Sequence, residues 1–566
     1  MILKALYDYY NRCDNLPPKG MEEKEIGFLL ILSPDGRFLR FEDCRIDKDD
    51  ARVYIVKKHI GRSSAAVANY LYDNSAYVLG YSDKGNGKEQ LYFGTFKEKV
   101  EAIADAFPDN KELSALKAFY KNSRETIIQI VSQDPLWEDI KKNLAKKYST
   151  FSFRIEGDLK ILAEKKELLQ LEQNEDQKTE SLCLVTGGHG PTVETTTATM
   201  IPGSQAIAKL VAFQVNSGYD SYGKTKCGNA PISEDAEFAY TTALNSMLQK
   251  DSRNKFLLGN RTFVFWASSH NEASVEAEES LFELLGFSEE TKDDPNANVI
   301  KVKKVFESIY SGELKTSLDD KFYILGLAPN SARIAVVFWS ETTLKDFAGK
   351  ILKHFEDMEI IDTRKDKKPY MGIRKIISSV TLGGKMSDAT PNLPEAVVKS
   401  IFQGLPYPAT LYSACIRRVR AEQELTITRA AILKAYLNRQ NNNDKKIGTM
   451  LDKENCNQGY LCGRLFAVLD KIQEDANHIR SIRERYMNGV SATPAAVFAT
   501  ILNLSVHHSE KLDEKRRIYF EKLKQEIINK ISANGFPSHL DLQDQGRFFV
   551  GYYHQIQDFY TSKKEQ

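Results

Sequence analysis

The sequence lacks the features that mark membrane-spanning and secreted proteins. It contains no run of about 18 apolar residues, so no transmembrane helix is expected. Residues 1–20 carry Asp8, Asn11 and Asp14 where a signal peptide needs an apolar core. We therefore expect a cytoplasmic protein with no membrane partner, whose N-terminal segment is part of the fold.

Cysteine pairs at metal-ligand spacing are also lacking. The 566 residues include seven cysteines, which are scattered and form no C-x-x-C pair. The two nearest, Cys456 and Cys462, have no companions at the spacing of metal ligands. Free thiols in a reducing compartment are the expected state, with no metal and no cofactor. The net charge of +1 does not by itself indicate nucleic acid, although a balanced total can hide basic faces.

What the sequence does contain is an α+β pattern followed by a helical one. Residues 25–46 predict a hairpin around "SPDG", and residues 321–341 predict another around "APNSAR". Beyond the charged segment 362–375 the pattern is almost entirely helical, and its last part favours an antiparallel bundle of four helices, beginning with a helix over 463–489. The expected domains are an α+β N-terminal domain (1–370), a basic helical connector (371–445) and an all-α bundle (446–566).

One short motif raises the question of nucleotide binding. "GYDSYGKT", residues 218–225, matches G-x-x-x-x-G-K-[ST] and follows the apolar run "KLVAFQV". A working P-loop has its lysine in the first turn of a helix, but Gly228 and Pro231 prevent a helix from beginning at Thr225. A Walker-B aspartate is also missing, because "IAVVFW" ends in Ser340. We interpret the match as chance, and an NTPase using residues 218–225 stays as an alternative.

The same loop has the residue types that suit a nucleic-acid backbone. Glycines let a ligand approach the main chain closely, tyrosines offer flat faces, and Lys224 and Lys226 offer charge. A plain surface loop is the other interpretation. No other catalytic constellation is present, since His189 has no nucleophile motif and His507-His508 have no H-E-x-x-H pattern. We do not expect an enzyme.

Several separated stretches resemble one known family. They are "MILKALYDYYNR" at the N-terminus, "GRSSAAVANYLYDNSAYVLGY" (61–81), "AFQVNSGYDSYGKTKCGNAPISEDAEFAYTTALN" (212–245), "LDKENCNQGYLCGRLFAVLDKIQEDA" (451–476), "SATPAAVFATILNLSVHH" (491–508) and "GYYHQ" (551–555). Together they are similar to the large subunit of the type I-C CRISPR Cascade complex, the Csd-type family, over the whole chain. Thr225, which completes the P-loop spelling, stands where that family usually has Glu.

The resemblance implies a non-catalytic, RNA-guided function. In this family the guide RNA reads the target by base pairing, and the large subunit inspects the protospacer-adjacent motif, the short duplex that flanks the target. The implied partners are CRISPR RNA, double-stranded target DNA, the backbone and guide-end subunits, the small subunit and a recruited helicase-nuclease. The C-terminal bundle resembles the small subunit, which is also made from an internal start, and Met450 is a candidate start. A purely architectural subunit is the remaining alternative.

The candidate DNA-binding residues follow from what groove recognition requires, namely amides, hydroxyls and close backbone approach. Asn74 is the first candidate for a base-edge contact, with an Asx-turn cap as the alternative. The further candidates at the flanking motif are Ser221, Tyr222, Gly223 and Lys224, and those at the DNA backbone are Lys57, Lys58, Arg62, Ser63 and Lys226. The candidates for the heteroduplex or the displaced strand are Arg464, Arg480, Arg483 and Arg485, with solvated helix charges as the alternative.

Overall fold

The structure is a computed structural model of the chain. It describes residues 2–47, 50–60, 66–83, 85, 87–146, 148–168, 180–213, 220–249, 251–284, 297–364, 372–385, 388–390, 392–440, 446–479 and 481–561. The chain divides into two compact units. The α/β unit comprises Cys13–Thr197 and Phe213–Ala243, and the helical unit comprises Met1–Arg12, Ala198–Ala212 and Leu244–Gln566.

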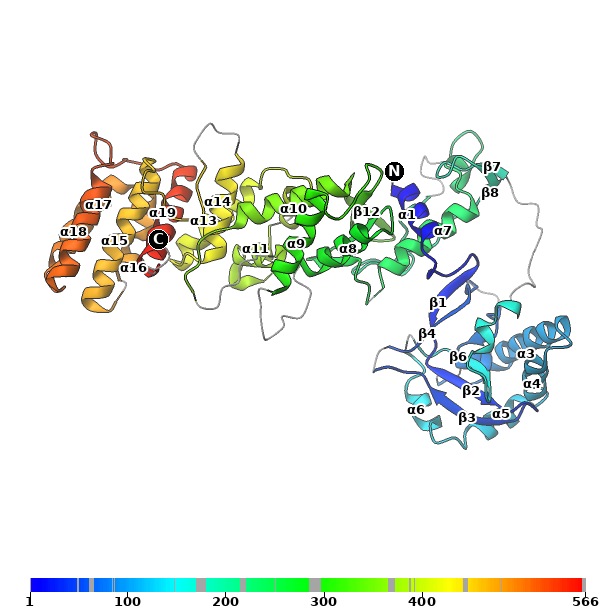
Figure 1. The fold of residues 1–566 in the computed structure, drawn as a ribbon. Helices are drawn as coiled ribbons and strands as arrows, with labels where there is room; N and C mark the ends of the chain where they lie inside the picture. Colours follow the sequence, from blue (N-terminus) through cyan, green and yellow to red (C-terminus); the bar gives the residue numbers. More distant parts are fainter. Residues whose placement is uncertain are drawn as a thin grey trace. The chain divides into compact units, whose positions relative to one another are not determined.

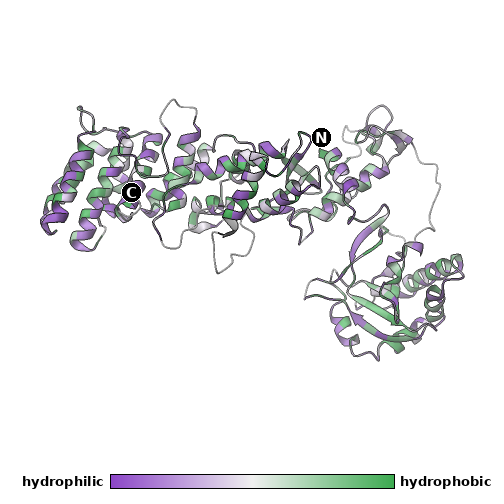
Figure 2. Cartoon of the chain, viewed as in Figure 1, coloured by the Kyte–Doolittle hydropathy of each residue, from purple (hydrophilic) through white to green (hydrophobic). Residues whose placement is uncertain are grey.

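A four-stranded sheet forms the centre of the α/β unit, in the order β3-β2-β6-β5 (Figure 1). All five residues of β2, "FLLIL", are buried, and Figure 2 shows this strand as hydrophobic. The predicted hairpin is confirmed, because β2 pairs antiparallel with β3 and Gly36 adopts a φ of 87° in the turn. β2 is parallel to β6, and β5 is antiparallel to β6. The strands are β2 (Phe28–Leu32), β3 (Phe38–Asp43), β5 (Tyr72–Asp73) and β6 (Phe151–Ile155).

Helices pack on this sheet around an aromatic core. Tyr120 lies 5.7 Å from Phe96 and 6.0 Å from Phe153, measured between ring centroids, and its hydroxyl donates to the Val78 carbonyl. Two two-stranded sheets, β1-β4 and β7-β8, complete the described strands of the unit. The helices are α2 (Ser75–Val78), α3 (Glu89–Ala106), α4 (Lys111–Phe119), α5 (Arg124–Val131) and α6 (Trp137–Lys142); the added strands are β1 (Met21–Glu25), β4 (Val53–Lys57), β7 (Glu180–Leu182) and β8 (His189–Pro191).

The helical unit contains an antiparallel sheet in the order β12-β11-β10-β9. The predicted hairpin around "APNSAR" is confirmed as β11 and β12, with Ser331 at a φ of 53° in the turn. The N-terminal helix α1 (Ile2–Arg12) belongs to this unit, and its Tyr9 ring meets Trp266 of β10 edge to face. The strands are β9 (Lys255–Leu258), β10 (Arg261–Ala267), β11 (Lys321–Asn330) and β12 (Arg333–Thr343).

The division of the chain differs from the predicted domain boundary near residue 370, and residues 365–371 lie outside the described part. One hydrophobic core runs from Phe256 through the strands of this sheet to Tyr553 near the C-terminus, so the sheet and the later helices fold as one unit. The helices are α8 (Glu272–Leu284), α9 (Ala297–Ser311), α10 (Leu344–Met358), α11 (Ile373–Ser379), α12 (Leu393–Phe402), α13 (Ala409–Glu422) and α14 (Ile427–Arg439). The division between the units falls within α7 (Glu234–Met247).

The C-terminal region is helical, as expected, and the α+β class is confirmed. The helix predicted over 463–489 is wrong in one respect: His478 takes a left-handed conformation, with a φ of 57°, and ends α15 before α16 begins. Figure 2 shows both hydrophobic and hydrophilic residues on these helices, as expected of helices that pack with one face and meet solvent with the other. They are α15 (Gln458–Asn477), α16 (Ser481–Ala492), α17 (Pro494–Ser509), α18 (Glu514–Ile528) and α19 (Leu542–Tyr560). None of the helices in the described residues is both long and apolar enough to cross a membrane.

Candidate nucleic-acid interface

Asn74 is exposed at the junction between β5 and α2, where it caps the helix. Its Oδ1 accepts a hydrogen bond from the Ala76 N–H at 3.0 Å, which is the Asx-cap geometry that sequence analysis left open. This bond also fixes the orientation of the amide, because the oxygen must face the helix. The group that remains for a ligand is therefore the Nδ2 donor.

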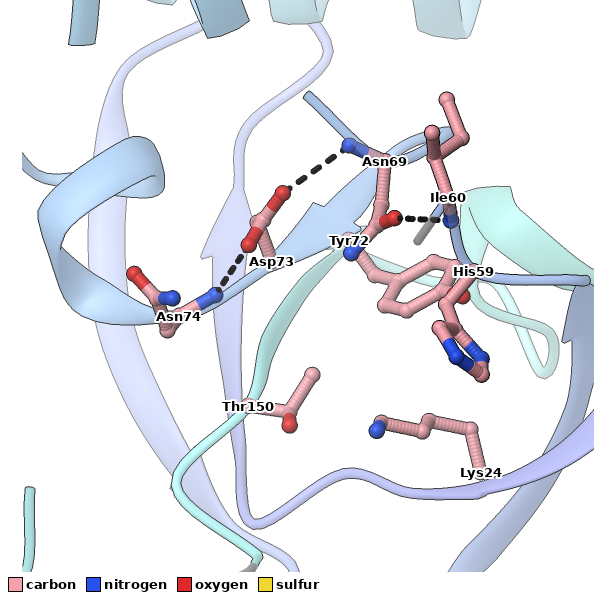
Figure 3. A pocket seen from close by; sticks show the side chains of 8 residues that line it. All are labelled: Lys24, His59, Ile60, Asn69, Tyr72, Asp73, Asn74 and Thr150. Carbon is pink, nitrogen blue, oxygen red and sulfur yellow. Dashed lines mark hydrogen bonds between the residues drawn. The ribbon is translucent and has the colours of Figure 1, made fainter. Parts of the chain in front are cut away.

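The loop that leads to Asn74 is held by a buried carboxylate. Asp73 is 2% exposed and accepts two backbone N–H bonds of 2.9 Å, from Asn69 on Oδ2 and from Asn74 on Oδ1 (Figure 3). Between them Leu71 is fully buried with a φ of 62°, a conformation that costs a side-chain-bearing residue about 1 kcal/mol or more. Its carbonyl accepts the Ser152 hydroxyl at 2.9 Å. The surrounding structure thus imposes the shape of the Asn69–Asn74 loop.

Asn74 lines a hollow of about 330 Å³ (Figure 3). Asn69 also lines it, and because Asn69 Oδ1 accepts the Ile60 N–H at 3.0 Å, it too is left with an amide donor. The remaining lining residues are Lys24, His59, Ile60, Tyr72, Asp73 and Thr150. The name "Asn74 hollow" is used below for this cavity.

A hydrogen bond between His59 and Glu22 lies at one side of the Asn74 hollow. His59 Nδ1 lies 2.7 Å from Glu22 Oε2, and the Tyr72 hydroxyl donates to Glu22 Oε1 at 3.2 Å. Burial raises the pKa of Glu22, but the hydrogen bond and charge of His59, with the charge of Lys24, outweigh it and lower the pKa below its ordinary value. The carboxylate is therefore ionised at neutral pH and holds the exposed His59 ring beside the hollow.

Two of the lysines predicted at the DNA backbone lie near the same hollow: Lys57 is the last residue of β4, and Lys58 follows it. The Lys57 ammonium lies 4.8 Å from the centroid of the Tyr70 ring, and the Lys57 carbonyl accepts the Tyr72 hydroxyl. The Lys58 ammonium donates to the Thr197 hydroxyl at 3.0 Å. Both side chains are half-buried. Arg62 and Ser63 lie outside the described residues, so their predicted contacts stay predictions.

The second predicted set forms a tight turn in which Tyr222 is fully exposed. The Lys224 N–H donates to the Ser221 carbonyl at 2.9 Å, and Tyr222 and Gly223 have φ values of 52° and 70°. Positive φ at both central residues is the signature of a type I′ turn. Tyr222 is 100% exposed and Lys224 is also exposed. The name "Tyr222 turn" is used below for Ser221–Lys224.

The Tyr222 turn does not have P-loop geometry. The apolar residues 209–213 form no strand, and the turn is followed by the four-residue 3-10 helix Lys226–Asn229, while α7 begins only at Glu234. The lysine is therefore not in the first turn of an α-helix, where backbone N–H groups would face a phosphate. Residues 218 and 219 of the motif lie outside the described residues. Lys226, predicted at the DNA backbone, forms an ion pair with Glu194 at 2.9 Å.

The structure corrects one of the C-terminal predictions. Arg464 in α15 is 0% exposed, and its guanidinium donates to Gln555 Oε1 at 3.1 Å and Glu526 Oε1 at 3.2 Å. It therefore holds helices of the bundle together and cannot reach a nucleic acid in this fold. Arg485 in α16 is exposed and Arg483 is half-buried, whereas Arg480 lies outside the described residues.

Comparison with known proteins decides the family. A family model described as CRISPR-associated protein (Cas_Csd1) matches residues 6–560. The chain belongs to the Csd1 family of CRISPR-associated proteins. The resemblance found in the sequence is thereby confirmed, and this Csd1 protein is a subunit of a CRISPR effector complex of the Cascade kind. Comparison with curated proteins finds no match.

Sequence reasoning missed three residues that the Csd1 structure places beside Asn74. Asn69 and Asp73 both lie in the quoted stretch "NYLYDN", where two amides flanking an acidic residue were a signal for a hydrogen-bonded loop. Lys24 carried no signal, because it lies in β1 and reaches the hollow only through the pairing of β1 with β4. Within the described part of the chain, no group of three or more His, Cys, Asp or Glu residues is arranged to hold a metal ion.

Proposed function

We propose that this Csd1 protein is the non-catalytic large subunit of a type I-C RNA-guided surveillance complex and that it recognises the protospacer-adjacent motif in double-stranded DNA. The observation that carries the proposal is Asn74. Its amide oxygen is committed to α2, so the exposed Nδ2 donor is presented in one orientation by a loop that Asp73 fixes. Preorganised amide donors of this kind recognise acceptor atoms on base edges.

The division of labour in such a complex explains why so few protein residues read sequence. The guide RNA reads the target by base pairing, so the large subunit needs to inspect only the short flanking duplex. Asn74 supplies the base contact in this scheme. Lys57, at the end of β4, and Lys58, which follows it, position the phosphate backbone beside it.

The Tyr222 turn supplies a second contact with the flanking DNA. The turn carries a fully exposed tyrosine, Tyr222, and two residues later the exposed Lys224. Lys224 contacts a phosphate, and Tyr222 or the Gly223 backbone approaches the groove. Once the flank is recognised, the subunit aids duplex opening, stabilises the R-loop and recruits the helicase-nuclease that cuts the DNA.

A binding selection with a randomised flank tests the proposal. The guide-loaded complex is offered target duplexes that differ only in the flanking base pairs, and the bound pool is sequenced. Wild type is expected to enrich particular flanks, and Asn74→Ala to lose the enrichment. Asn110→Ala is the matched control, because Asn110 caps α4 in the same unit in the same way, through the Leu113 N–H at 2.9 Å. Asn110→Ala should keep the preference.

Two outcomes would replace the proposal. If wild type shows no flank preference, the subunit is architectural and does not read DNA. If ATP binds to the protein and Lys224→Ala abolishes that binding, residues 218–225 form a nucleotide site and the NTPase alternative applies.

A further inference from the structure

We propose that the Asn74 hollow is a binding pocket for a single unstacked nucleotide from the DNA that flanks the target. The inference rests on the proposed function and extends it: the subunit would not only inspect the flanking duplex but also take one base out of its stack. Four features of the hollow support this: its size, the depth of Asn69, the position of Lys24 and the flat ring of His59.

The size of the hollow suits one nucleotide and excludes a duplex. Its volume of about 330 Å³ lies near the lower limit of small-molecule pockets, which begin at about 300 Å³. A stacked base pair is too large to enter such a space, whereas enzymes that extrude a nucleotide place it in a close-fitting pocket. Of the parts of a DNA duplex, a single nucleotide is therefore the unit that the hollow can admit.

The depth of Asn69 favours a ligand that enters the hollow. Asn69 lines the hollow and is 9% exposed, while Asn74, which also lines it, is exposed. Both amide oxygens are engaged, by the N–H groups of Ile60 and Ala76, which leaves an Nδ2 donor on each of two residues that line the hollow. Two donors at different depths match a base whose edge carries acceptor atoms and whose outer part stays at the edge of the pocket.

Lys24 and His59 could bind the phosphate and the flat face of the base, respectively. Within the described part of the chain Lys24 forms no ion pair, and its side chain lies in the hollow opposite Asn69 and Asn74 in Figure 3, so its ammonium can bind a phosphate. The His59 ring, held by Glu22, offers a flat exposed face on which an extruded base can stack. Asp73 is a positioning residue, because its two N–H bonds fix Asn69 and Asn74 relative to each other.

Fluorescence of 2-aminopurine, which increases when the base leaves its stack, tests the pocket directly. The guide-loaded complex is bound to duplexes that carry this base at each flanking position in turn, on either strand. The first guide positions are mismatched to the target, so that no heteroduplex forms and only the flank can respond. Wild type is expected to raise the fluorescence several-fold at one flanking position.

Two pocket variants and one control decide whether the Asn74 hollow is responsible. Lys24→Ala and Asn69→Ala should return the signal at that position towards the level of the free duplex, whereas Lys111→Ala, which removes an exposed lysine of α4 in the same unit, should leave it unchanged. If Asn69→Ala does not assemble, Lys24→Ala alone carries the comparison.

The inference and the proposed function fail in different ways. Suppose that wild type selects particular flanks but 2-aminopurine fluorescence rises at no flanking position, or that the rise is the same in both pocket variants. The proposed nucleotide pocket is then wrong, whereas flank recognition stands. If wild type selects no flank at all, the proposed function itself is wrong.

Discussion

At Asn74 a single amide serves both the fold and the proposed DNA contact. The oxygen caps α2 and the nitrogen is left as a donor, so the two interpretations that the sequence left open are compatible with each other. The sequence identified Asn74 but not its surroundings. The reason is that Lys24 and Thr150 reach the hollow from segments distant in the chain, which residue patterns do not reveal.

Lys224 offers the clearest electrostatic prediction at the residue scale. Lys224→Ala removes an exposed ammonium from the Tyr222 turn without touching a buried group, so the turn should keep its shape. Because each phosphate contact releases about one counterion, the slope of log K against log salt should become shallower by about one unit. Titrations of target duplex over a salt series measure it.

Lys111→Ala is the control for Lys224→Ala, since it removes an equally exposed lysine from α4. An unchanged slope in Lys224→Ala, or an equal change in both variants, would mean that the Tyr222 turn does not contact the backbone.

At the scale of elements, α15 and α19 pack closely against each other in the helical unit. A Cβ added at Gly463 would overlap the Phe548 carbonyl oxygen, and one added at Gly551 would overlap the Tyr460 carbonyl oxygen. The two helices therefore approach with their backbones in contact, which only glycine permits. Tyr460 in α15 and His554 in α19 are joined by a hydrogen bond of 2.9 Å.

Gly463→Ala is expected to destabilise the helical unit by about 2 kcal/mol or more, because neither backbone can move without disrupting the core. Thermal or urea unfolding of the purified chain measures the change. Gly94→Ala in α3 is the matched control, since an added Cβ there meets nothing within 4 Å. It should be neutral or stabilising by up to about 1 kcal/mol. Equal effects of the two substitutions would contradict the close packing.

The presence of a strand or helix was easier to predict from the sequence than the residue at which it ends or the residues that it contacts. The hairpins were visible because "SPDG" and "APNSAR" separate alternating or apolar runs, and both formed. The break between α15 and α16 could not be predicted from the sequence, because the left-handed conformation of His478 does not change the hydrophobic periodicity. Arg464 was misassigned for a related reason: an arginine within an apolar helix is buried only when distant residues such as Gln555 accept its N–H groups.

At the scale of the whole molecule, the helical unit buries two histidines in the neutral form. His354 is fully buried with Nδ1 2.7 Å from the Tyr407 hydroxyl, and His554 is 1% exposed. Burial, with the nearby charge of Arg439 for His354 and of Lys434 for His554, lowers the pKa of each to about 3. Protonation is therefore costly in the folded state at both positions.

The free energy of unfolding should fall as the pH is lowered below the ordinary histidine pKa of about 6.5. Between that value and about 3 the unfolded chain binds protons at His354 and His554 that the folded chain does not. Each histidine then contributes a slope of up to about 1.4 kcal/mol per pH unit, with stability lost towards acid. Urea unfolding between pH 5 and pH 7 measures the slope.

His354→Asn should make that slope shallower, whereas His539→Asn, which alters an exposed histidine, should not. Equal slopes in the wild type and His354→Asn would contradict the buried neutral state of His354.

The division into units was the least predictable property at this scale. Residues 256–360 have the strand content of an N-terminal α+β domain, yet their core is continuous with the helices that follow. Composition indicated a boundary at the charged segment 362–375, but hydrogen bonds cross it, since the Ile361 carbonyl accepts the Tyr553 hydroxyl at 2.9 Å. Charge density marks the surface of a chain and not the limits of its cores.

The measurement that tests the central claim most directly is flank discrimination by an Asn74→Ser complex. Serine keeps the cap of α2 and adds no charge, so folding and the salt dependence of binding should match those of wild type. It lacks the Nδ2 donor, however, so the ratio of affinities for the preferred and a disfavoured flank should fall by about tenfold. If Asn74→Ser keeps the full ratio at every salt concentration, Asn74 is only a helix cap, and base recognition by this residue is refuted.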